Sequence, residues 1–300
     1  MVPERVRTWV QQHVDREIVA VEALGGGRTD TISAVYLDRG DPLVLRHLPV
    51  GRWGEVGWRH VWSEARACQL LADAELPVPR LVASDSDAQQ LGAYVNLTSW
   101  LPGAVRLEPL GPAAIDELAR VAAVIHATGV PLDRRLLPYE FWTPAELDVP
   151  TWTQQPDLWC RAIALFEAGP PSTPATLLHR DFHPGNILWQ GDRISGVIDW
   201  AEASWGPSDL DVAHSSTNFA LLHDVRRGAA FRHDYRRHGG RVDTDEHAAR
   251  FWVVSDLLGF LPDPVPIVAA LTWTRRDLTD TLVRQRLEHL LAVTLSPSAP

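Results

Sequence analysis

The stretch Leu-His-Arg-Asp-Phe-His-Pro-Gly-Asn at residues 178–186, followed by Ile-Asp-Trp at 198–200, contains the residues on which the fold assignment depends. Asp181 lies five residues before Asn186, and Asp199 lies thirteen residues after Asn186. A single Asp in a loop is most often a turn residue. Three oxygen-bearing side chains at these two spacings instead indicate a catalytic site.

The segment between Asn186 and Asp199 has the pattern of a β-hairpin. The two predicted strands cover 186–189 and 194–198, and Gln-Gly-Asp-Arg at 190–193 supplies turn residues between them. A hairpin of this length brings Asn186 and Asp199 to the same end. Two oxygen ligands and the nearby carboxylate of Asp181 then face one cavity. Mg²⁺ prefers one or two such ligands together with phosphate oxygens and water.

The order H-x-D-x₄-N followed by an Asp is typical of phosphoryl-transferring kinases. With these motifs the sequence resembles the aminoglycoside phosphotransferase family, a branch of the protein-kinase-like fold, from about residue 20 to about residue 215. The resemblance includes the hairpin 187–198 and the stretch IDWAEASWGPSDLDVA at 198–213. That family has Asp-Trp where protein kinases have Asp-Phe-Gly, and Asp199-Trp200 fits this pattern.

The resemblance implies a role for each residue of the motif. Asp181 would orient the acceptor hydroxyl and take its proton. Asn186 and Asp199 would hold Mg²⁺ across the phosphates of ATP or GTP. Asp211 matches a family residue that lies beyond the metal site and braces the catalytic loop. Arg180 occupies a position where the antibiotic kinases more often have a small residue, and the sequence leaves its role open.

The nucleotide side of the site is predicted in the first hundred residues. The segment 25–31 lies where the family has its phosphate-covering hairpin. The backbone of Gly27 could approach phosphates closely, and the hydroxyls of Thr29 and Thr31 could donate hydrogen bonds to them. The resemblance also implies that backbone groups of Ser99–Leu101, on the segment that links the lobes, bind adenine.

The chain contains no lysine, because all 28 of its basic residues are Arg. This composition excludes Schiff-base and general-base lysines, and also P-loop nucleotidases, which need a Lys after their glycines. A kinase of this sequence must therefore use Arg at the phosphate-binding position. Arg46 lies on the predicted third strand, where kinases have that Lys, and Glu64 on the next helix fits the partner acid. Codon bias is the simpler explanation for the missing lysines.

The overall composition restricts the remaining possibilities. A net charge of −10 argues against a nucleic-acid partner. Cys68 and Cys160 are too far apart in sequence to suggest a disulfide framework or a cysteine metal site. The chain shows no signal peptide and no apolar run of about 18 residues that would cross a membrane. We therefore expect a soluble cytoplasmic protein, a monomer or weak dimer, with no membrane or nucleic-acid partner.

The predicted fold is α+β, a two-lobed protein-kinase-like fold. The N-lobe, residues 1–101, would be an antiparallel sheet plus one helix, and the C-lobe, residues 102–300, would be mostly helical. The predicted N-lobe elements are helices at 3–15 and 61–75 and strands at 18–24, 31–37, 43–48, 80–84 and 92–98. The predicted C-lobe helices are 112–127, 156–168, 208–223, 227–238, 245–260, 264–272 and 276–294.

Two alternative interpretations of the residues remain open. His179, Asp181 and His183 alternate along an extended segment, so they could instead form the metal site of a hydrolase. The segment 140–167 carries Trp142, Trp152 and Trp159 with the acids Glu140, Glu146, Asp148, Asp157 and Glu167. These side chains could bind a polyhydroxylated or cationic acceptor, or they could equally form part of the core and a solvated acidic face.

The predicted function is Mg²⁺-dependent transfer of the γ-phosphate of ATP or GTP to a hydroxyl of a small molecule. An antibiotic such as an aminoglycoside is the leading acceptor. A macrolide, a nucleoside antibiotic, a sugar or an amino-alcohol metabolite is the alternative. A metallohydrolase and a non-catalytic kinase-like binding protein are the remaining hypotheses.

Overall fold

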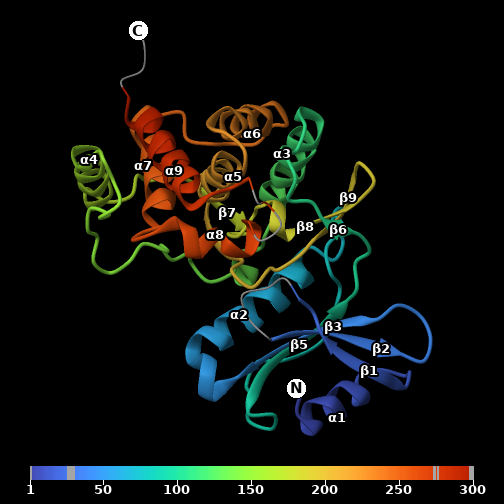
Figure 1. The fold of residues 1–300 in the computed structure, drawn as a ribbon. Helices are drawn as coiled ribbons and strands as arrows, with labels where there is room; N and C mark the ends of the chain where they lie inside the picture. The colour runs from blue at the N-terminus through green and yellow to red at the C-terminus, as the bar shows by residue number, and fades with distance from the viewer. Residues whose placement is uncertain (1, 26–30, 273–274, 276, 297–300) are drawn as a thin grey trace. The chain divides into compact units, whose positions relative to one another are not determined.

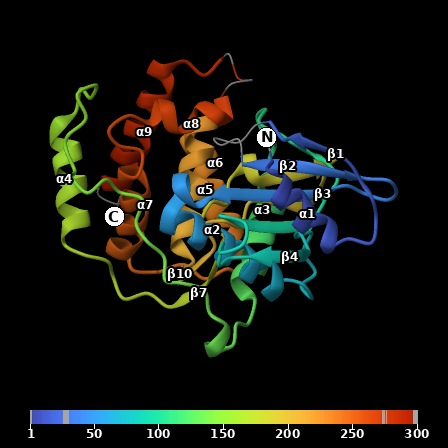
Figure 2. The same cartoon turned by 90° about the horizontal axis from the view of Figure 1, so that it is seen from below.

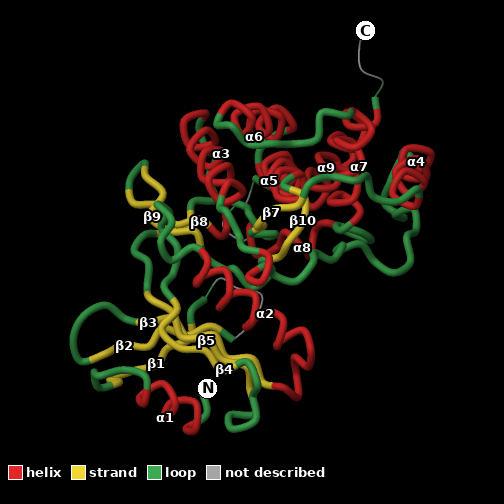
Figure 3. Tube along the Cα trace, turned by 180° about the vertical axis from the view of Figure 1, so that it is seen from behind, coloured by secondary structure: helices red, strands yellow, loops and turns green. Residues whose placement is uncertain are grey.

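The computed structural model describes residues 2–25, 31–272, 275 and 277–296. The chain forms two compact units (Figure 1). Unit 1 consists of Met1–Ala104 together with Ile187–Ala203, and unit 2 consists of Val105–Asn186 and Ser204–Pro300. Most strands belong to unit 1, whereas unit 2 is built mainly from helices (Figure 3).

Unit 1 contains a five-stranded antiparallel sheet in the order β1-β2-β3-β5-β4 within the described residues. Its strands are β1 (Ile18–Ala23), β2 (Ile32–Leu37), β3 (Leu43–Pro49), β4 (Leu81–Asp85) and β5 (Ala93–Ser99). Helix α1 (Glu4–Gln12) packs Val6 and Val10 against one face of this sheet, where Leu45 and Leu97 are buried. The predicted β1-β2-β3 meander is confirmed.

Helix α2 (Val50–Leu70) differs from its predicted range of 61–75. It begins directly after Pro49 and is divided by Gly54, whose φ of 49° is left-handed. Gly57 then lets the helix approach the sheet closely, because a Cβ there would lie 2.9 Å from the ring of Tyr94. The prediction missed the first turns because their Gly and Trp residues show no helical apolar repeat. The helix buries Glu64, so α2 sets the position of this acid.

A second strand pair in unit 1 is the predicted hairpin. Strand β8 (Ile187–Gln190) pairs antiparallel with β9 (Arg193–Val197), and Gly191 adopts the left-handed φ of 58° in the turn. The backbone N–H of Val197 donates to Pro77 O at 2.8 Å, and this bond connects the hairpin to the loop before β4. The hairpin therefore carries Asp199 into unit 1. The short strand β6 (Ala104–Val105) extends this hairpin to a three-stranded sheet in the order β6-β8-β9, and the first segment of unit 1 ends at Ala104.

The core of unit 2 surrounds one buried helix, α5 (Asp209–Leu222), all of whose residues are buried. Helices α6, α7 and α9 pack against it (Figure 1, Figure 2). The other helices of unit 2 are α3 (Pro112–Ala127), α4 (Pro156–Glu167), α6 (Val225–Arg237), α7 (Glu246–Leu258), α8 (Pro264–Thr272) and α9 (Asp280–Leu295), with short 3₁₀ turns at Leu132–Arg134 and Pro184–Asn186. Helix α3 has the predicted bounds, because Pro112 occupies its first turn.

A short strand pair positions the loop that carries His179, Asp181 and Asn186. Strands β7 (Ala175–Leu178) and β10 (Ser204–Pro207) are antiparallel, and Leu178 pairs with Ser204. The sequence did not predict either strand. Each has only four residues, β10 contains Gly206 and Pro207, and their partners are far apart in the chain. Within the described residues no helix combines the length and the apolar composition that a membrane crossing requires.

Candidate active site

Asp211, in the first turn of α5, holds the loop that follows β7. Its carboxylate accepts hydrogen bonds from the backbone N–H groups of His179 and Arg180, both at 2.8 Å. His126 of α3 approaches the same carboxylate with Nε2 at 3.0 Å. Arg180 has a left-handed φ of 73°, a conformation that is strained for a residue with a Cβ. The contacts of Asp211 stabilise this turn and thereby set the direction of Asp181.

The protonation of Asp211 is linked to stability. Burial alone would raise the pKa of Asp211, but the hydrogen bond and charge of His126 lower it below its ordinary value. A depressed pKa in the folded state means that the unfolded chain binds the proton more readily. The stability that Asp211 contributes is therefore present above the unfolded pKa of about 3.9 and is lost as pH falls.

We expect Asp211→Asn to lower the free energy of unfolding by about 1.5–3 kcal/mol at neutral pH. The neutral amide has only one acceptor oxygen, so it cannot accept all of the hydrogen bonds that the carboxylate accepts. The variant should also lose part of the stability change between pH 5 and 3. Urea unfolding across that range measures both effects. Asp209→Asn is the matched control, since burial raises the pKa of Asp209 and the sign of its pH dependence is opposite. Equal pH profiles for the two variants would contradict this account.

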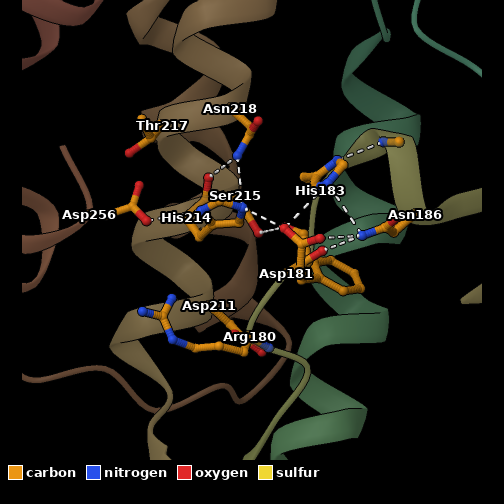
Figure 4. A network of polar contacts seen from close by, with 12 residues as sticks. Arg180, Asp181, His183, Asn186, Asp211, His214, Ser215, Thr217, Asn218 and Asp256 are labelled. Carbon is orange, nitrogen blue, oxygen red and sulfur yellow. Dashed lines mark hydrogen bonds and ion pairs between the residues drawn. The ribbon is translucent and has the colours of Figure 1, made fainter. Parts of the chain in front are cut away.

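Asp181 lies at the centre of a polar network in unit 2 (Figure 4). Its Oδ1 lies 3.2 Å from Nε2 of His214 and 3.4 Å from Nε2 of His183. Its Oδ2 accepts from Nδ2 of Asn186 at 2.9 Å. Burial alone would raise the pKa of Asp181, but the charges and hydrogen bonds of the two histidines hold this pKa well below its usual range. The side chain keeps 29% of its exposure, so an ionised carboxylate remains accessible to a substrate.

Asn186 is oriented by the same loop. Its amide nitrogen donates to the backbone carbonyl of Asp181 and to Oδ2 of Asp181, both at 2.9 Å. Because the nitrogen is used in this way, the amide oxygen is the atom of Asn186 that is suited to a cation. An amide oxygen is a hard ligand of the kind that Mg²⁺ accepts.

Unit 1 contains a second charged cluster around Arg46. Arg46 donates from Nε to Glu64 Oε2 at 2.8 Å and from Nη2 to Glu64 Oε1 at 2.9 Å, and Nη2 also donates to Asp199 Oδ1 at 2.9 Å. The side chains of Arg46 and Glu64 are each only 10% exposed. Burial alone would lower the pKa of Arg46, but the charges of Glu64 and Asp199 raise it. The cluster is therefore a fixed cation held by two acids.

Asp199 meets Arg46 through an unusual backbone conformation. Its φ is 62°, in the left-handed region, and the indole N–H of the next residue, Trp200, donates to Val197 O at 3.0 Å. Oδ1 binds the guanidinium, so Oδ2 is the carboxylate oxygen suited to a metal ion. This carboxylate oxygen, like the amide oxygen of Asn186, is a hard ligand of the kind that Mg²⁺ accepts.

The structure brings Arg46, Glu64 and Asp199 together in unit 1, and Asp181 and Asn186 together in unit 2. The remaining predicted site residues lie in unit 1, and they are Thr31, Ser99 and Leu101. The carbonyl of Thr31 accepts from His47 N at 2.9 Å, and the hydroxyl of Ser99 accepts from Arg80 N at 2.9 Å. Gly27 and Thr29 fall outside the described residues.

The residues of the network that were not predicted include His214 and Asp256. His214 lies one turn after Asp211 in α5, and Asp256 lies in α7. The motif spacing gives no indication of either residue. The available signal was the run His-Ser-Ser-Thr-Asn at 214–218, which places consecutive polar residues in a helix that the structure buries completely. Buried polar side chains require partners, so such a run indicates a polar site.

The structure changes the set of residues that could hold a metal ion in the hydrolase alternative. Ligand atoms of Asp181, His183 and His214 all lie within 4.8 Å of one another, whereas His179 is not part of this group. However, Gly185 N donates to Nδ1 of His183 at 2.9 Å. This bond fixes the ring of His183 with Nε2 toward Asp181 and toward Nδ2 of Asn186.

The predicted acceptor-binding tryptophans divide into two groups. Trp159 is completely buried in the core of unit 2, and Trp152 packs against that core. Trp142 instead faces the network, with its ring 5.0 Å from the ring of His214. The guanidinium of Arg180 lies 3.9 Å from the centre of the Trp142 ring, and its Nη2 donates to Glu140 O at 3.2 Å. Trp142 is therefore the candidate for an acceptor contact.

Comparison with known proteins supports the fold. The phosphotransferase enzyme family matches residues 20–252, and no curated protein matches the sequence. The chain is similar to the spectinomycin phosphotransferase APH(9)-Ia in complex with ADP and spectinomycin, with a TM-score of 0.63, 15% identity, and coverage of 98% of this chain and 97% of that chain. It is also similar to the amicoumacin kinase hAmiN in complex with AMP-PNP and Ca²⁺, with a TM-score of 0.62, 12% identity, and coverage of 96% and 93%.

A macrolide 2′-phosphotransferase from Brachybacterium faecium is a further similar structure. Its TM-score is 0.54, its identity is 18%, and 99% of this chain and 100% of that chain are covered. Together these similarities confirm the predicted fold, a mixed α and β kinase-like architecture with an N-terminal antiparallel sheet and a helical C-terminal part.

Proposed function

Because the chain belongs to the phosphotransferase enzyme family, we propose that it transfers the γ-phosphate of ATP or GTP to a hydroxyl of a small molecule. An antibiotic such as an aminoglycoside is the proposed acceptor. The observation that carries this proposal is the carboxylate of Asp181, which is ionised, accessible and held by Asn186 and two histidines.

Asp181 is the proposed catalytic residue. As the acceptor oxygen forms its bond to the γ-phosphorus, the bond from that phosphorus to the β–γ bridging oxygen breaks, and the proton of the hydroxyl passes to Asp181. The transition state is loose, so proton transfer is late and positioning matters as much as basicity. The network around Asp181 supports this role, because it fixes the carboxylate through both oxygens.

Asn186 and Asp199 are the proposed ligands of Mg²⁺. Their support is the chemistry described above, an amide oxygen and a carboxylate oxygen that other contacts leave available. A bound Mg²⁺ would neutralise charge on the nucleotide phosphates. Within the chain itself, Arg46 holds Asp199 in place through its Nη2 at 2.9 Å.

The nucleotide is proposed to bind residues of the lobe 1–101. Arg46, oriented by Glu64, would bind a phosphate group, since a guanidinium can bridge a phosphate and a carboxylate. Gly27, Thr29 and Thr31 would cover the phosphates, and backbone groups of Ser99 and Leu101 would bind adenine, as the family resemblance implies. The lobe 102–300 would then supply the catalytic loop and the acceptor-binding helices.

Similar folds and the charge of the chain support the proposed acceptor class. Proteins of similar fold include spectinomycin, macrolide and amicoumacin kinases. The net charge of −10 and the acids of 140–167 suit a cationic acceptor. A macrolide, a nucleoside antibiotic, a sugar or an amino alcohol is the alternative. We further propose a cytoplasmic monomer or weak dimer without a nucleic-acid or membrane partner.

The decisive experiment is a panel of hydroxylated acceptors with γ-labelled ATP and GTP in the presence of Mg²⁺. We expect at least one antibiotic to take up label as a phosphate ester. Label on a metabolite but on no antibiotic would overturn the resistance role while leaving the kinase. Phosphate transfer to no acceptor, together with tightly bound zinc by elemental analysis, would overturn the kinase in favour of a hydrolase.

A further inference from the structure

A buried imidazole connects Asp181 to a second acid. His214 of α5 lies with Nε2 3.2 Å from Asp181 Oδ1 and with Nδ1 2.9 Å from Asp256 Oδ1 (Figure 4). The side chains of His214 and Asp256 are 7% and 2% exposed. Carboxylates thus face both ring nitrogens, and a ring between two carboxylates can bind both of them only when both nitrogens carry protons.

The position of the His214 ring is fixed on its other sides. The ring of Trp142 meets it edge-on at 5.0 Å, and the ring of Phe260 stacks on it at 6.5 Å. The Asn218 amide nitrogen donates to the backbone carbonyl of His214 at 3.0 Å, which holds the Asn218 side chain beside the ring. The imidazole therefore has little freedom to rotate away from Asp181.

The charge of His214 depends on the groups that face it. These are Asp181 and His183 from the catalytic loop and Asp256 from α7. Burial alone would lower the pKa of His214, but the charge of Asp256 and the hydrogen bond to Asp181 raise it to about 9. The imidazolium is thus stable at neutral pH, and the contact is lost as pH rises through about 9.

We propose that His214, held by Asp256, is a positioning residue that fixes Oδ1 of Asp181 and directs Oδ2 toward the acceptor hydroxyl. This inference rests on the proposed phosphotransferase function. His214 keeps both of its protons throughout the reaction, and the proton of the hydroxyl passes to Oδ2 of Asp181. Without the imidazolium, Oδ1 would keep only the longer contact to His183 at 3.4 Å, and the partly exposed carboxylate would lose part of its alignment.

The geometry predicts a specific kinetic effect. We expect His214→Ala to lower kcat by about 10²-fold, as a small misplacement of a reacting group does, while the KM for the nucleotide changes less than about twofold. His214→Gln should recover part of kcat, because its amide N–H can reach toward Asp181. Asp256→Asn should give an intermediate loss. Steady-state kinetics with a fixed acceptor that lacks amino groups measures these values.

His223→Gln is the matched control. His223 terminates the same helix and is 6% exposed, and it has no contact with the catalytic loop among the contacts of the described residues. Burial and three nearby arginines lower the pKa of His223 to about 4, so the substitution replaces a neutral ring. We expect kcat to change by less than roughly twofold. A loss equal to that of His214→Gln would show a general packing effect and would overturn the proposal.

The pH profile separates positioning from folding. In the wild-type enzyme kcat should fall as pH rises through about 9, and in His214→Gln this alkaline limb should disappear. Lysine cannot produce the limb, because the chain has none. An unchanged limb in His214→Gln, or a wild-type kcat in both His214 variants, would overturn the proposal.

Titration of the His214 Hε1 resonance by NMR tests the contact without any assay of activity. We expect a midpoint near 9 in the wild-type protein and a lower midpoint in Asp181→Asn and in Asp256→Asn. A midpoint near 6.5 that neither substitution changes would remove the contact, and with it the inference, even if the enzyme transfers phosphate. Normal titration in a protein that phosphorylates no acceptor would instead overturn the proposed function and leave the ion pairs established.

Discussion

Replacing Asp181 with Asn should lower kcat by about 10²–10⁴-fold, the range that is typical for loss of a general base. The amide is neutral and cannot take the proton of the hydroxyl. In the wild-type protein, Oδ1 of Asp181 lies 3.2–3.4 Å from Nε2 of His214 and of His183. In the variant, an NH₂ group in place of this oxygen would face the N–H groups of these rings. The KM for the nucleotide should change little, because the proposed role of Asp181 concerns the acceptor hydroxyl and not the nucleotide. Steady-state kinetics with the best acceptor of the panel tests this expectation.

Asp73→Asn is a suitable control for Asp181→Asn, because Asp73 is an exposed acid in the turn after α2. Thermal unfolding of both variants should show that neither has lost its fold. Asp181 also bonds to Asn186, so a modest change in stability is compatible with the catalytic role. Turnover within a few-fold of the wild-type value in folded Asp181→Asn would refute the assignment of Asp181 as the catalytic residue.

Arg46→Ala should have the largest effect on stability. It would leave the carboxylate of Glu64 buried, with the side chain 10% exposed and Asn96 Nδ2 as a remaining donor at 2.9 Å. Removing one partner of a buried pair typically destabilises a protein by about 3–5 kcal/mol. Urea unfolding should report this loss, and the nucleotide KM should rise or kcat should fall. Normal kinetics and normal stability would remove Arg46 from the site.

A double substitution separates stability from function. Arg46→Met combined with Glu64→Leu replaces the ion pair by apolar groups of similar volume, which is often neutral for stability. We expect this protein to unfold near the wild-type denaturant concentration and yet to be inactive. Arg46→Lys should give partial activity, because one ammonium cannot reproduce the planar fork that meets both oxygens of Glu64. An active double variant would show that the pair serves the fold alone.

The local elements of the fold could be predicted because their signals are local. Pro112 marked the start of α3, and the turn at Gly191 marked the β8–β9 hairpin. The meander β1-β2-β3 was also evident from alternating apolar residues and short turns. The pairing of Arg46 with Glu64 followed from the family resemblance, since the two residues lie on different elements and have no common local pattern.

The rest depended on contacts between distant parts of the chain. Strands β7 and β10 stabilise each other although 25 residues or more separate them, and neither is stable by its own composition. Helix α2 begins eleven residues earlier than predicted, because Gly57 packs on Tyr94 of β5. His214 meets Asp181 and Asp256 only because α5 and α7 pack together. Apolar periodicity and motif spacing in the sequence do not indicate such contacts between distant residues.

The guanidinium of Arg46 determines which reagents can detect this enzyme. Nucleotide probes that label kinases by acylating the lysine at the phosphate-binding position need a nucleophilic amine there. In the proposed nucleotide site that position is occupied by Arg46, and the chain has no lysine elsewhere to react in its place. A survey of nucleotide-binding proteins that relies on amine acylation would therefore overlook this protein. Dicarbonyl reagents, which condense with guanidinium groups, are the appropriate chemistry, and bound nucleotide should protect Arg46 from them.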